Sequence, residues 1–517
     1  MQEQELLGEF QTARGLMAGN PLLMPPGALV DGRNVTYRDG RLCKRRGYTV
    51  LKANGVGAHP VRLSKFFRAT DWTPRLIALT EHKAFSWDPV TPDFHDEGNL
   101  GGADVTSIDA CEWGVGTVYI CKQGQALSYW DGGAATDFVA SGALNPIGGA
   151  AYYPSCIRPY NNCLVGANDG TNRQAVCWSN SLTPNTFAGT SFNHLIDARG
   201  QITALELVGK ALAIFAEESI HTMLYVGGTP PFIFHRADAT VGTLAPRSIG
   251  LLGPPYSGQL VFLGSDFNIH TFDGLRTVPQ ADVIHPILKD LLEENYLGKA
   301  NGFVWPKDGV YYLSVPSSGS SENNLVIEWR YRLGQFYLHQ ISGNGGWTAA
   351  AQYPKSTALT WAGLTALGTT WAHLDMSWAE LMQTTGRRPV GFFGTAGDFV
   401  RLFDGLSDAG AVVNAYAEFA PFASAAHETK ESDYLEILDD RSSGASNLIV
   451  AVGGSADGAS FTFEKQFHSL LPTTEMPKED FRASGRWFKV KVQNLSLNEQ
   501  FNLRGWRLYG KQVGRER

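Results

Sequence analysis

The side chains of this sequence best suited to metal or acid–base chemistry are its 12 histidines and a few adjacent carboxylates. No two histidines stand at the HxxH or HExxH spacing, so a metal site would need ligands from distant strands. Glu217–Glu218 and Asp439–Asp440 do not form acid–base pairs, because neighbouring residues of a strand point to opposite faces. We therefore expect no metal, no cofactor and no catalytic centre.

The nearest match to an enzyme motif lies late in the chain. Ser455-Ala456-Asp457-Gly458 is similar to the Asp-box of sialidase-like propellers, Ser-x-Asp-x-Gly-x-Thr-Trp, but its glycine comes one place early and there is no second copy. The GNGG run at 343–346 is not followed by the Lys-Ser/Thr of a phosphate-binding loop. The sequence therefore predicts a protein that is not an enzyme.

A recurring aromatic-Asp turn indicates how the chain is organised. The pattern ends in Asp88, Asp131, Asp273 and Asp404, and looser copies bring the spacing to roughly 40 to 60 residues, the length of a four-stranded meander. With 57 Gly, 25 Pro and 43% hydrophobic residues, the composition favours many short strands joined by turns. We predict an all-β fold with a β-propeller of six to eight blades. The expected blades cover 62–97, 106–139, 155–187, 202–236, 248–279 and 301–340, with one or two more within 346–404.

The stretch from 253 to 292 combines a meander of β-strands with the start of a helix. Two Gly-containing turns, at Gly264 and Asp273-Gly274, join three short apolar strands into a meander. An amphipathic helix of about four turns is then predicted as an insertion at 281–295. Its apolar face must be covered by the propeller or by a neighbouring subunit, which makes the following residues candidate subunit contacts: Ile284, Ile287, Leu288 and Leu291.

The whole chain divides into four expected parts. Residues 1–28 have no clear period and are expected to form an extended arm that lies on a neighbouring subunit or on the body of the chain. Residues 29–59 are expected to form an N-terminal β-hairpin that turns at Asp39-Gly40. Residues 60–415 would form the propeller, and 416–517 a C-terminal β-sandwich-like domain with a short tail. The second hairpin strand carries a basic cluster, which we interpret as a solvated charged face or a subunit contact rather than a phosphate site: Arg41, Lys44, Arg45 and Arg46.

Charge and cysteine content limit the remaining classes. A net charge of −7 argues against a surface that grips nucleic acid throughout. The six cysteines form no CxxC pair and are expected to be small buried side chains. No apolar run approaches the roughly 20 residues of a membrane-spanning helix, and the N-terminus lacks the features of a secretion signal, so we expect synthesis in the cytoplasm.

Several segments, taken in order, give the chain a family resemblance. They are NVTYRDGRLCKRRGY near the N-terminus, TVGTLAPRSIG with LVFLGSDFNIHTFDG, the pair VYYLSVP and NLVIEWRYRLGQFYLH, and the closing VGGSADGASFTF, SGRWFKVKV and RGWRLYGK. This series resembles the propeller-containing virion proteins of short-tailed bacteriophages, and in particular the tail nozzle protein at the distal end of the tail.

The resemblance implies a structural role in the virion tail. The chain would form a homo-oligomeric ring, a hexamer, below the adaptor of the head-to-tail connector and beside fibre, spike or needle proteins, with genomic DNA passing transiently through its channel. We expect the channel lining to be acidic or neutral, because each Lys or Arg facing DNA would add attraction to its phosphates. The alternative is a glycan- or receptor-binding tail module, a sialidase-like propeller without catalytic motifs.

Overall fold

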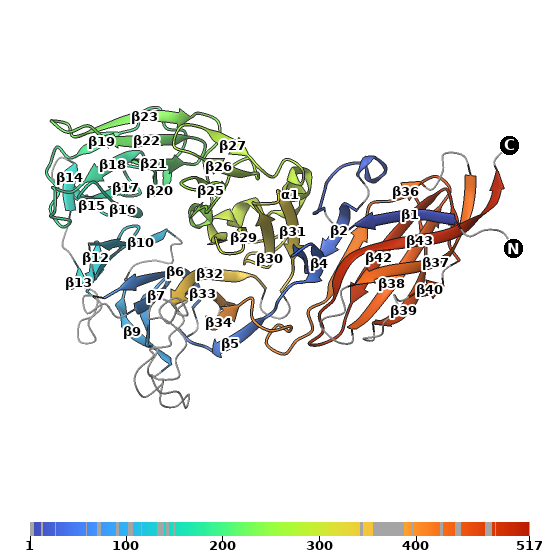
Figure 1. Cartoon of the computed structure of the whole chain (residues 1–517). Coiled ribbons are helices and arrows are strands. Elements are labelled where there is room, and N and C mark those ends of the chain that lie inside the picture. The colour runs from blue at the N-terminus through green and yellow to red at the C-terminus, as the bar shows by residue number, and fades with distance from the viewer. Residues whose placement is uncertain are drawn as a thin grey trace, which may run out of the picture.

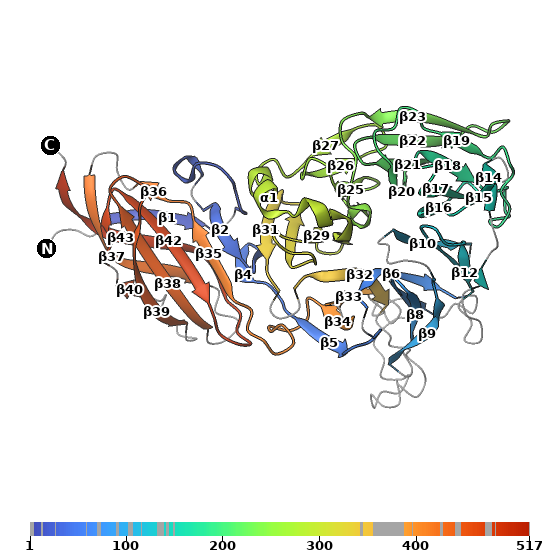
Figure 2. The same cartoon turned by 180° about the vertical axis from the view of Figure 1, so that it is seen from behind.

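The chain forms two bodies built of β-strands, a ring of small sheets and a two-sheet sandwich beside it (Figures 1 and 2). The computed structural model describes residues 5–515 except 12–13, 26, 58, 70–73, 89–91, 102–106, 115, 132–138, 141–143, 148–149, 342–344, 355–386, 395–396, 424–427, 440–445, 471–477 and 481. The stretch 355–386, which the sequence assigned to further blades, lies outside the described residues.

The ring is a β-propeller with seven four-stranded antiparallel blades in the described part of the chain. The first three blades are β6 to β9 (Val61–Arg68, Pro74–Thr80, Lys83–Asp88, Asp93–Asn99), β10 to β13 (Ile108–Trp113, Thr117–Lys122, Ser128–Trp130, Val139–Ala140) and β16 to β19 (Cys156–Tyr160, Cys163–Ala167, Ala175–Trp178, Phe192–His194). The next three are β20 to β23 (Ile202–Val208, Ala211–Ala216, Ile220–Tyr225, Phe232–Asp238), β24 to β27 (Gly250–Leu251, Leu260–Leu263, Ile269–Phe272, Thr277–Pro279) and β28 to β31 (Asn301–Trp305, Val310–Val315, Leu325–Arg330, Gln335–His339). A small hairpin, β14 and β15 (Leu144–Ile147, Ala150–Tyr152), precedes the third blade. The all-β propeller prediction is confirmed.

Apolar side chains fill the spaces between blades. The second strands β21 and β29 are buried along their whole length, because their sheets are packed on both faces. Aromatic pairs bridge neighbouring blades: Phe67 and Trp130 join the first two at 5.5 Å between ring centroids, and Phe215 and Phe262 join the fourth and fifth at 5.1 Å. The aromatic-Asp repeat therefore recurs because Trp130 and Phe272 are buried against the adjacent blade.

The seventh blade closes the ring with a strand from the other end of the chain. Its strands are β32 (Trp347–Pro354), β33 (Arg387–Phe393), β34 (Asp398–Leu402) and, outermost, β5 (Tyr48–Lys52). The register pairs Tyr48 with Leu402, immediately after Gly47. A Cβ on Gly47 would lie 1.8 Å from the carbonyl oxygen of Ser407, so this approach of β5 requires glycine. Residues expected to lie in a separate hairpin instead complete the propeller.

The turn at Asp273-Gly274 has the geometry that the sequence predicted. Asp273 Oδ1 accepts hydrogen bonds from the backbone N–H groups of Leu275 (2.8 Å) and Arg276 (2.9 Å), and Gly274 has a φ of +99°. We expect Gly274→Val to lower the free energy of unfolding by about 1–3 kcal/mol, measured by urea denaturation, because a β-branched residue is strained at this φ.

The matched control for this turn is Gly189→Val. Gly189 has open space around its Cβ position, and a surface substitution of this kind should change stability by no more than about 0.5 kcal/mol. Equal stabilities for the two variants would contradict the strain at Gly274.

The second body is a sandwich that draws strands from both ends of the chain. One sheet contains β1 (Glu5–Gln11), β3 (Val35–Arg38), β4 (Arg41–Lys44), β37 (Glu428–Asp439), β40 (Lys478–Asp480), β41 (Ser484–Gly485) and β43 (Asn502–Arg515). The other contains β2 (Leu29–Arg33), β35 (Ala415–Phe419), β36 (Phe422–Ala423), β38 (Ser446–Ser455), β39 (Thr462–Leu470) and β42 (Trp487–Asn494). The expected division into an extended arm at 1–28, a hairpin at 29–59 and a sandwich at 416–517 is therefore corrected, because the N-terminal strands β1 to β4 belong to the sandwich.

The inserted helix is shorter than predicted. The helix α1 spans His285–Leu291, and 3-10 turns lie at Pro21–Leu23, Pro246–Ser248 and Glu294–Lys299. Pro286 stands in the first turn of α1, where its missing N–H and fixed φ are tolerated, and this position sets the start of the helix. The expected four turns over 281–295 are thus reduced to about two.

Candidate functional site

The sequence-predicted contact residues come together where the propeller meets the sandwich. The N-terminal segment runs through this junction and bonds to blade six along the way. The N–H groups of Leu16 and Asn34 donate to the carbonyl oxygens of Phe336 (2.9 Å) and Leu338 (3.0 Å), and Ala18 N–H donates to Val283 (2.8 Å). The segment therefore lies on its own chain rather than on a neighbour.

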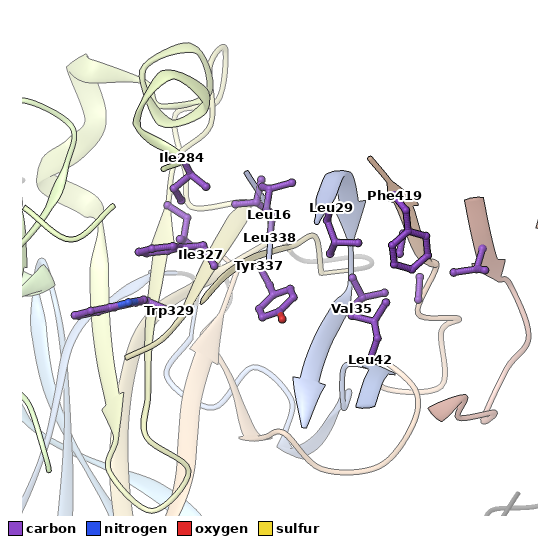
Figure 3. Close-up of a cluster of buried hydrophobic side chains, with 14 of the residues drawn as sticks. Leu16, Leu29, Val35, Leu42, Ile284, Ile327, Trp329, Tyr337, Leu338 and Phe419 are labelled. Carbon is purple, nitrogen blue, oxygen red and sulfur yellow. The ribbon is translucent and has the colours of Figure 1, made fainter. Parts of the chain in front are cut away.

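One hydrophobic core is continuous across the junction. It joins Ile327 and Trp329 of blade six to Leu29, Val35 and Leu42 of the sandwich, and it extends to Trp506 on β43. Figure 3 shows Ile327, Trp329, Leu29, Val35 and Leu42 in the region where the two bodies meet, with Ile284 above Ile327 and Leu29 facing Phe419. Because both bodies bury apolar surface in the same cluster, neither can move far without exposing it.

The apolar face of α1 belongs to this core. Ile284 and Leu288 are fully buried, and Ile287 and Leu291 are partly buried against the same cluster. The prediction that this face must be covered is confirmed. The interpretation as subunit contacts is corrected for Ile284 and Leu288, because the chain itself covers them. For Ile287 and Leu291, which remain partly exposed, it stays a prediction.

We expect Ile284→Val to destabilise the fold by about 0.5–1.5 kcal/mol, measured by thermal or urea unfolding, because it deletes one buried methylene. Val283→Ala is the control, since Val283 is 43% exposed, and it should stay within about 0.5 kcal/mol. If the two variants lose equal stability, α1 is not anchored through Ile284.

Arg45 of the basic cluster is the centre of a buried ion pair. Its Nη1 and Nη2 donate to the two carboxylate oxygens of Asp408, at 2.8 and 2.5 Å, and its Nε donates to Asn34 Oδ1 at 2.8 Å. The side chains of Arg45 and Asp408 are 8% and 0% exposed. Nη2 also donates to the carbonyl oxygen of Gln340 at 3.1 Å. Arg45 thus links the N-terminal segment, blade six and the loop that enters the sandwich.

Lys44 is also buried within the chain. Its Nζ donates to Asn494 Oδ1 and to the carbonyl oxygen of Ser496, both at 2.9 Å. Burial lowers the pKa of Lys44 to about 8. Arg41 is half-buried and only Arg46 is exposed. The predicted charged face for subunit contact is therefore corrected for Lys44 and Arg45, because both side chains bind partners inside the chain. For Arg41 and Arg46 it stays a prediction.

A second charged group joins blade six to β3. Glu328 accepts hydrogen bonds from Thr36 Oγ1 (2.6 Å) and His339 Nε2 (2.6 Å), and its other close partner is Arg330 Nε at 2.7 Å. Burial alone would raise the pKa of Glu328, but Arg330 and His339 bring it down to about 2. Burial lowers the pKa of His339, so its ring is neutral near pH 7 and Nε2 carries the shared proton.

The propeller axis is closed by side chains. Arg158 donates to Asp109 (2.6 Å) and Glu206 (2.9 Å), and Lys65 Nζ lies 3.5 Å from Asp109. Burial would raise the pKa of Asp109, but Arg158 and Lys65 hold it below its usual value. Residues of six blades, and of the turn that leads into the fifth, line a central cavity of about 200 Å³. That volume holds only a few waters, so a DNA duplex cannot pass along this axis.

The residues considered for catalysis do not gather. Glu217 accepts from Gln201 in a turn of blade four, Asp439 ends β37 in the sandwich, and Asp440 lies outside the described residues. Ser455 and Asp457 cap a hairpin turn, where Asp457 Oδ1 accepts from Ala459 N–H at 2.9 Å. All six cysteines are buried and free, as predicted.

The described part of the chain has neither a cluster of metal-binding side chains nor a membrane-spanning helix. Among these residues, no group of three or more His, Cys, Asp or Glu side chains is placed to hold a metal ion. Within the same part of the chain, no helix has the length and apolar character needed to cross a membrane.

The sequence reasoning missed the acidic and amide partners at the junction. Asp408, Glu328, Asn34 and Asn494 are separated from their partners by up to 450 residues. The one available signal was Glu328 within the apolar strand LVIEWR, where a central charge predicts a buried partner.

Comparisons with known proteins add little to this geometry. No protein-family model matches the sequence, and no curated protein matches it. A chain in the crystal structure of the mitotic checkpoint complex is similar with a TM-score of 0.41 and 10% identity, over 70% of this chain and 94% of that one. The N-terminal domain of Nup159 is similar with a TM-score of 0.35 and 10% identity, over 69% of this chain and 94% of that one. Neither similarity bears on function.

Proposed function

We propose that this protein is a structural component of a bacteriophage tail, a ring-forming subunit of the nozzle at the distal end of the DNA channel. The observation that carries the proposal is the single hydrophobic core that unites propeller and sandwich. The N-terminal strands also join the two bodies, since β1 to β4 lie in the sandwich and β5 in the last blade. A subunit of this construction transmits force without hinging, which suits a part that bears the pressure of DNA ejection. The assignment to a bacteriophage tail rests on the series of sequence segments that resembles the tail nozzle family.

The proposal places the DNA channel between copies of the chain. The axis of each propeller is narrowed to a small cavity by the ion pairs of Arg158. The conduit must therefore be enclosed by a ring of subunits, which is a hexamer in the family that the chain resembles. Lys44 and Arg45 are buried and cannot contact DNA in such a channel. A net charge of −7 on each copy favours a lining that does not hold the phosphates.

The proposal is tested on purified particles of the phage that encodes the chain. We expect mass spectrometry to detect the chain in intact virions and in isolated tails, and cryo-electron microscopy to place several copies around the distal channel. Particles that lack the chain would refute the proposal. A single asymmetric copy at the tail tip would refute the ring.

A further inference from the structure

We infer that one face of the propeller, formed by blades three to six, is a docking surface for the acidic opposite face of a second copy of this chain. This turn face consists of the loops that join the first strand to the second and the third to the fourth in each of these blades. The inference rests on the proposed ring and adds which surfaces make the contact between its subunits.

Successive strands of a meander run in opposite directions, so the turns after the first and third strands lie at the same end of each blade. In adjacent blades these turns form one continuous face. Contacts between blades show the continuity directly. Tyr160 Oη, from the first turn of blade three, donates to the carbonyl oxygen of Lys210 (2.9 Å) and accepts from Tyr225 N–H (3.1 Å) in blade four. Arg332, in blade six, donates from Nε to the carbonyl oxygen of Pro254 in blade five at 3.3 Å.

Large apolar side chains are exposed along this face. Leu275 is 82% exposed and Leu182 is 71% exposed, at the outer turns of blades five and three. Four more lie at or beside turns of the same face: Leu207, Tyr225, Val226 and Leu333. Single exposed apolar residues are ordinary, but a series on one face of one domain is typical of an interaction site.

The two faces of these blades differ in charge. On the turn face the exposed basic residues Lys210, Arg276, Lys307 and Arg332 outnumber Asp273 and Asp308. The loops on the opposite face carry five exposed acids: Asp197, Glu218, Asp282, Asp290 and Glu294. Their exposed bases are Arg173, Arg199 and Lys289, and Arg236 of β23 pairs with Asp197 at 3.6 Å, so the acids exceed the bases by one.

A second copy therefore presents a surface complementary to the turn face. An interface between two different faces of the same chain is heterologous, and it closes into a ring when the rotation between subunits permits. Because the turn face also contains acidic Asp273 and Asp308, a protein surface matches it better than an anionic membrane does.

The test is sedimentation velocity of the full-length chain over a wide concentration range. We expect concentration-dependent assembly of the natural chain. The variant Leu275→Glu with Leu333→Glu should assemble roughly 100-fold more weakly, because it places two charges in an apolar contact. Leu23→Glu is the control, since Leu23 is 83% exposed and lies away from the propeller turns, and it should assemble as the natural chain does.

Reversing the charge of two acidic residues tests the opposite face of the propeller. Glu218→Lys with Asp282→Lys should also weaken assembly, and equal melting temperatures for all variants show that folding is unaffected. A monomeric natural chain at every concentration, or unchanged assembly of the Leu275 and Leu333 variant, would overturn the inference. So would a monomeric chain that binds phosphatidylserine vesicles through Leu275 and Leu333.

The two proposals fail in different ways. If the chain is present in tails but its assembly does not depend on the turn face, the inference about this face is wrong and the proposed function stands. If the chain self-associates through the turn face but is absent from particles, the docking surface stands and the tail role is wrong.

Discussion

Replacing Asp408 with alanine is expected to lower the free energy of unfolding by about 3–5 kcal/mol, because the guanidinium of Arg45 would be left buried without a counter-charge. Both carboxylate oxygens of Asp408 are engaged by Arg45, at 2.8 and 2.5 Å, and neither side chain has appreciable contact with solvent. Urea denaturation followed by tryptophan fluorescence measures this loss.

Asp404→Ala is the matched control for Asp408→Ala. Asp404 lies 3.3 Å from Arg401 in an ion pair that is about one-third exposed on both sides, so its loss should cost no more than about 1 kcal/mol. Replacing both partners of the buried pair, Arg45→Met with Asp408→Leu, should restore most of the lost stability. If Asp408→Ala costs no more than Asp404→Ala, the pair does not hold the junction.

Replacing Glu328 with glutamine is expected to cost a similar amount, about 3–5 kcal/mol at pH 7. The amide keeps the size of the side chain and part of the hydrogen bonding to Thr36 and His339, but it leaves Arg330 without its negative partner. The measurement is again the free energy of unfolding in urea, and Glu218→Gln on the exposed surface is the control.

The Glu328 contribution has a defined pH dependence. The pKa of Glu328 is about 2 in the fold and 4.5 without it, so the carboxylate stabilises the fold above about pH 4.5 and this contribution is lost as the pH falls toward 2. The pKa of His339 is also lowered by burial, which makes acid below about pH 6.5 destabilising in the same direction. The stability difference between the natural chain and Glu328→Gln should therefore narrow between pH 4.5 and pH 2. A constant difference over that range would contradict the assignment.

The amino-acid sequence by itself determined the local elements. Alternating apolar residues in β42, the Asp-Gly turns at Gly40 and Gly274, and the buried aromatic residues Trp130 and Phe272 follow from side-chain periodicity and backbone geometry, which are local properties. These features predicted the all-β fold and the bounds of six blades to within a few residues, except that blade three extends past its predicted end at Phe187 to His194.

Only the tertiary structure decided which distant strands pair and which charges meet. β5 completes the last blade, β1 to β4 join the C-terminal sandwich, and Arg45 meets Asp408 across 363 residues, because partner choice depends on complementary edges and shared burial that no periodicity encodes. The same packing buried Lys44, Arg45, Ile284 and Leu288, for which the sequence pattern predicted only that a covering partner is needed. A charge or an apolar stripe thus specifies that a partner is needed, and the fold determines that the partner lies in the same chain.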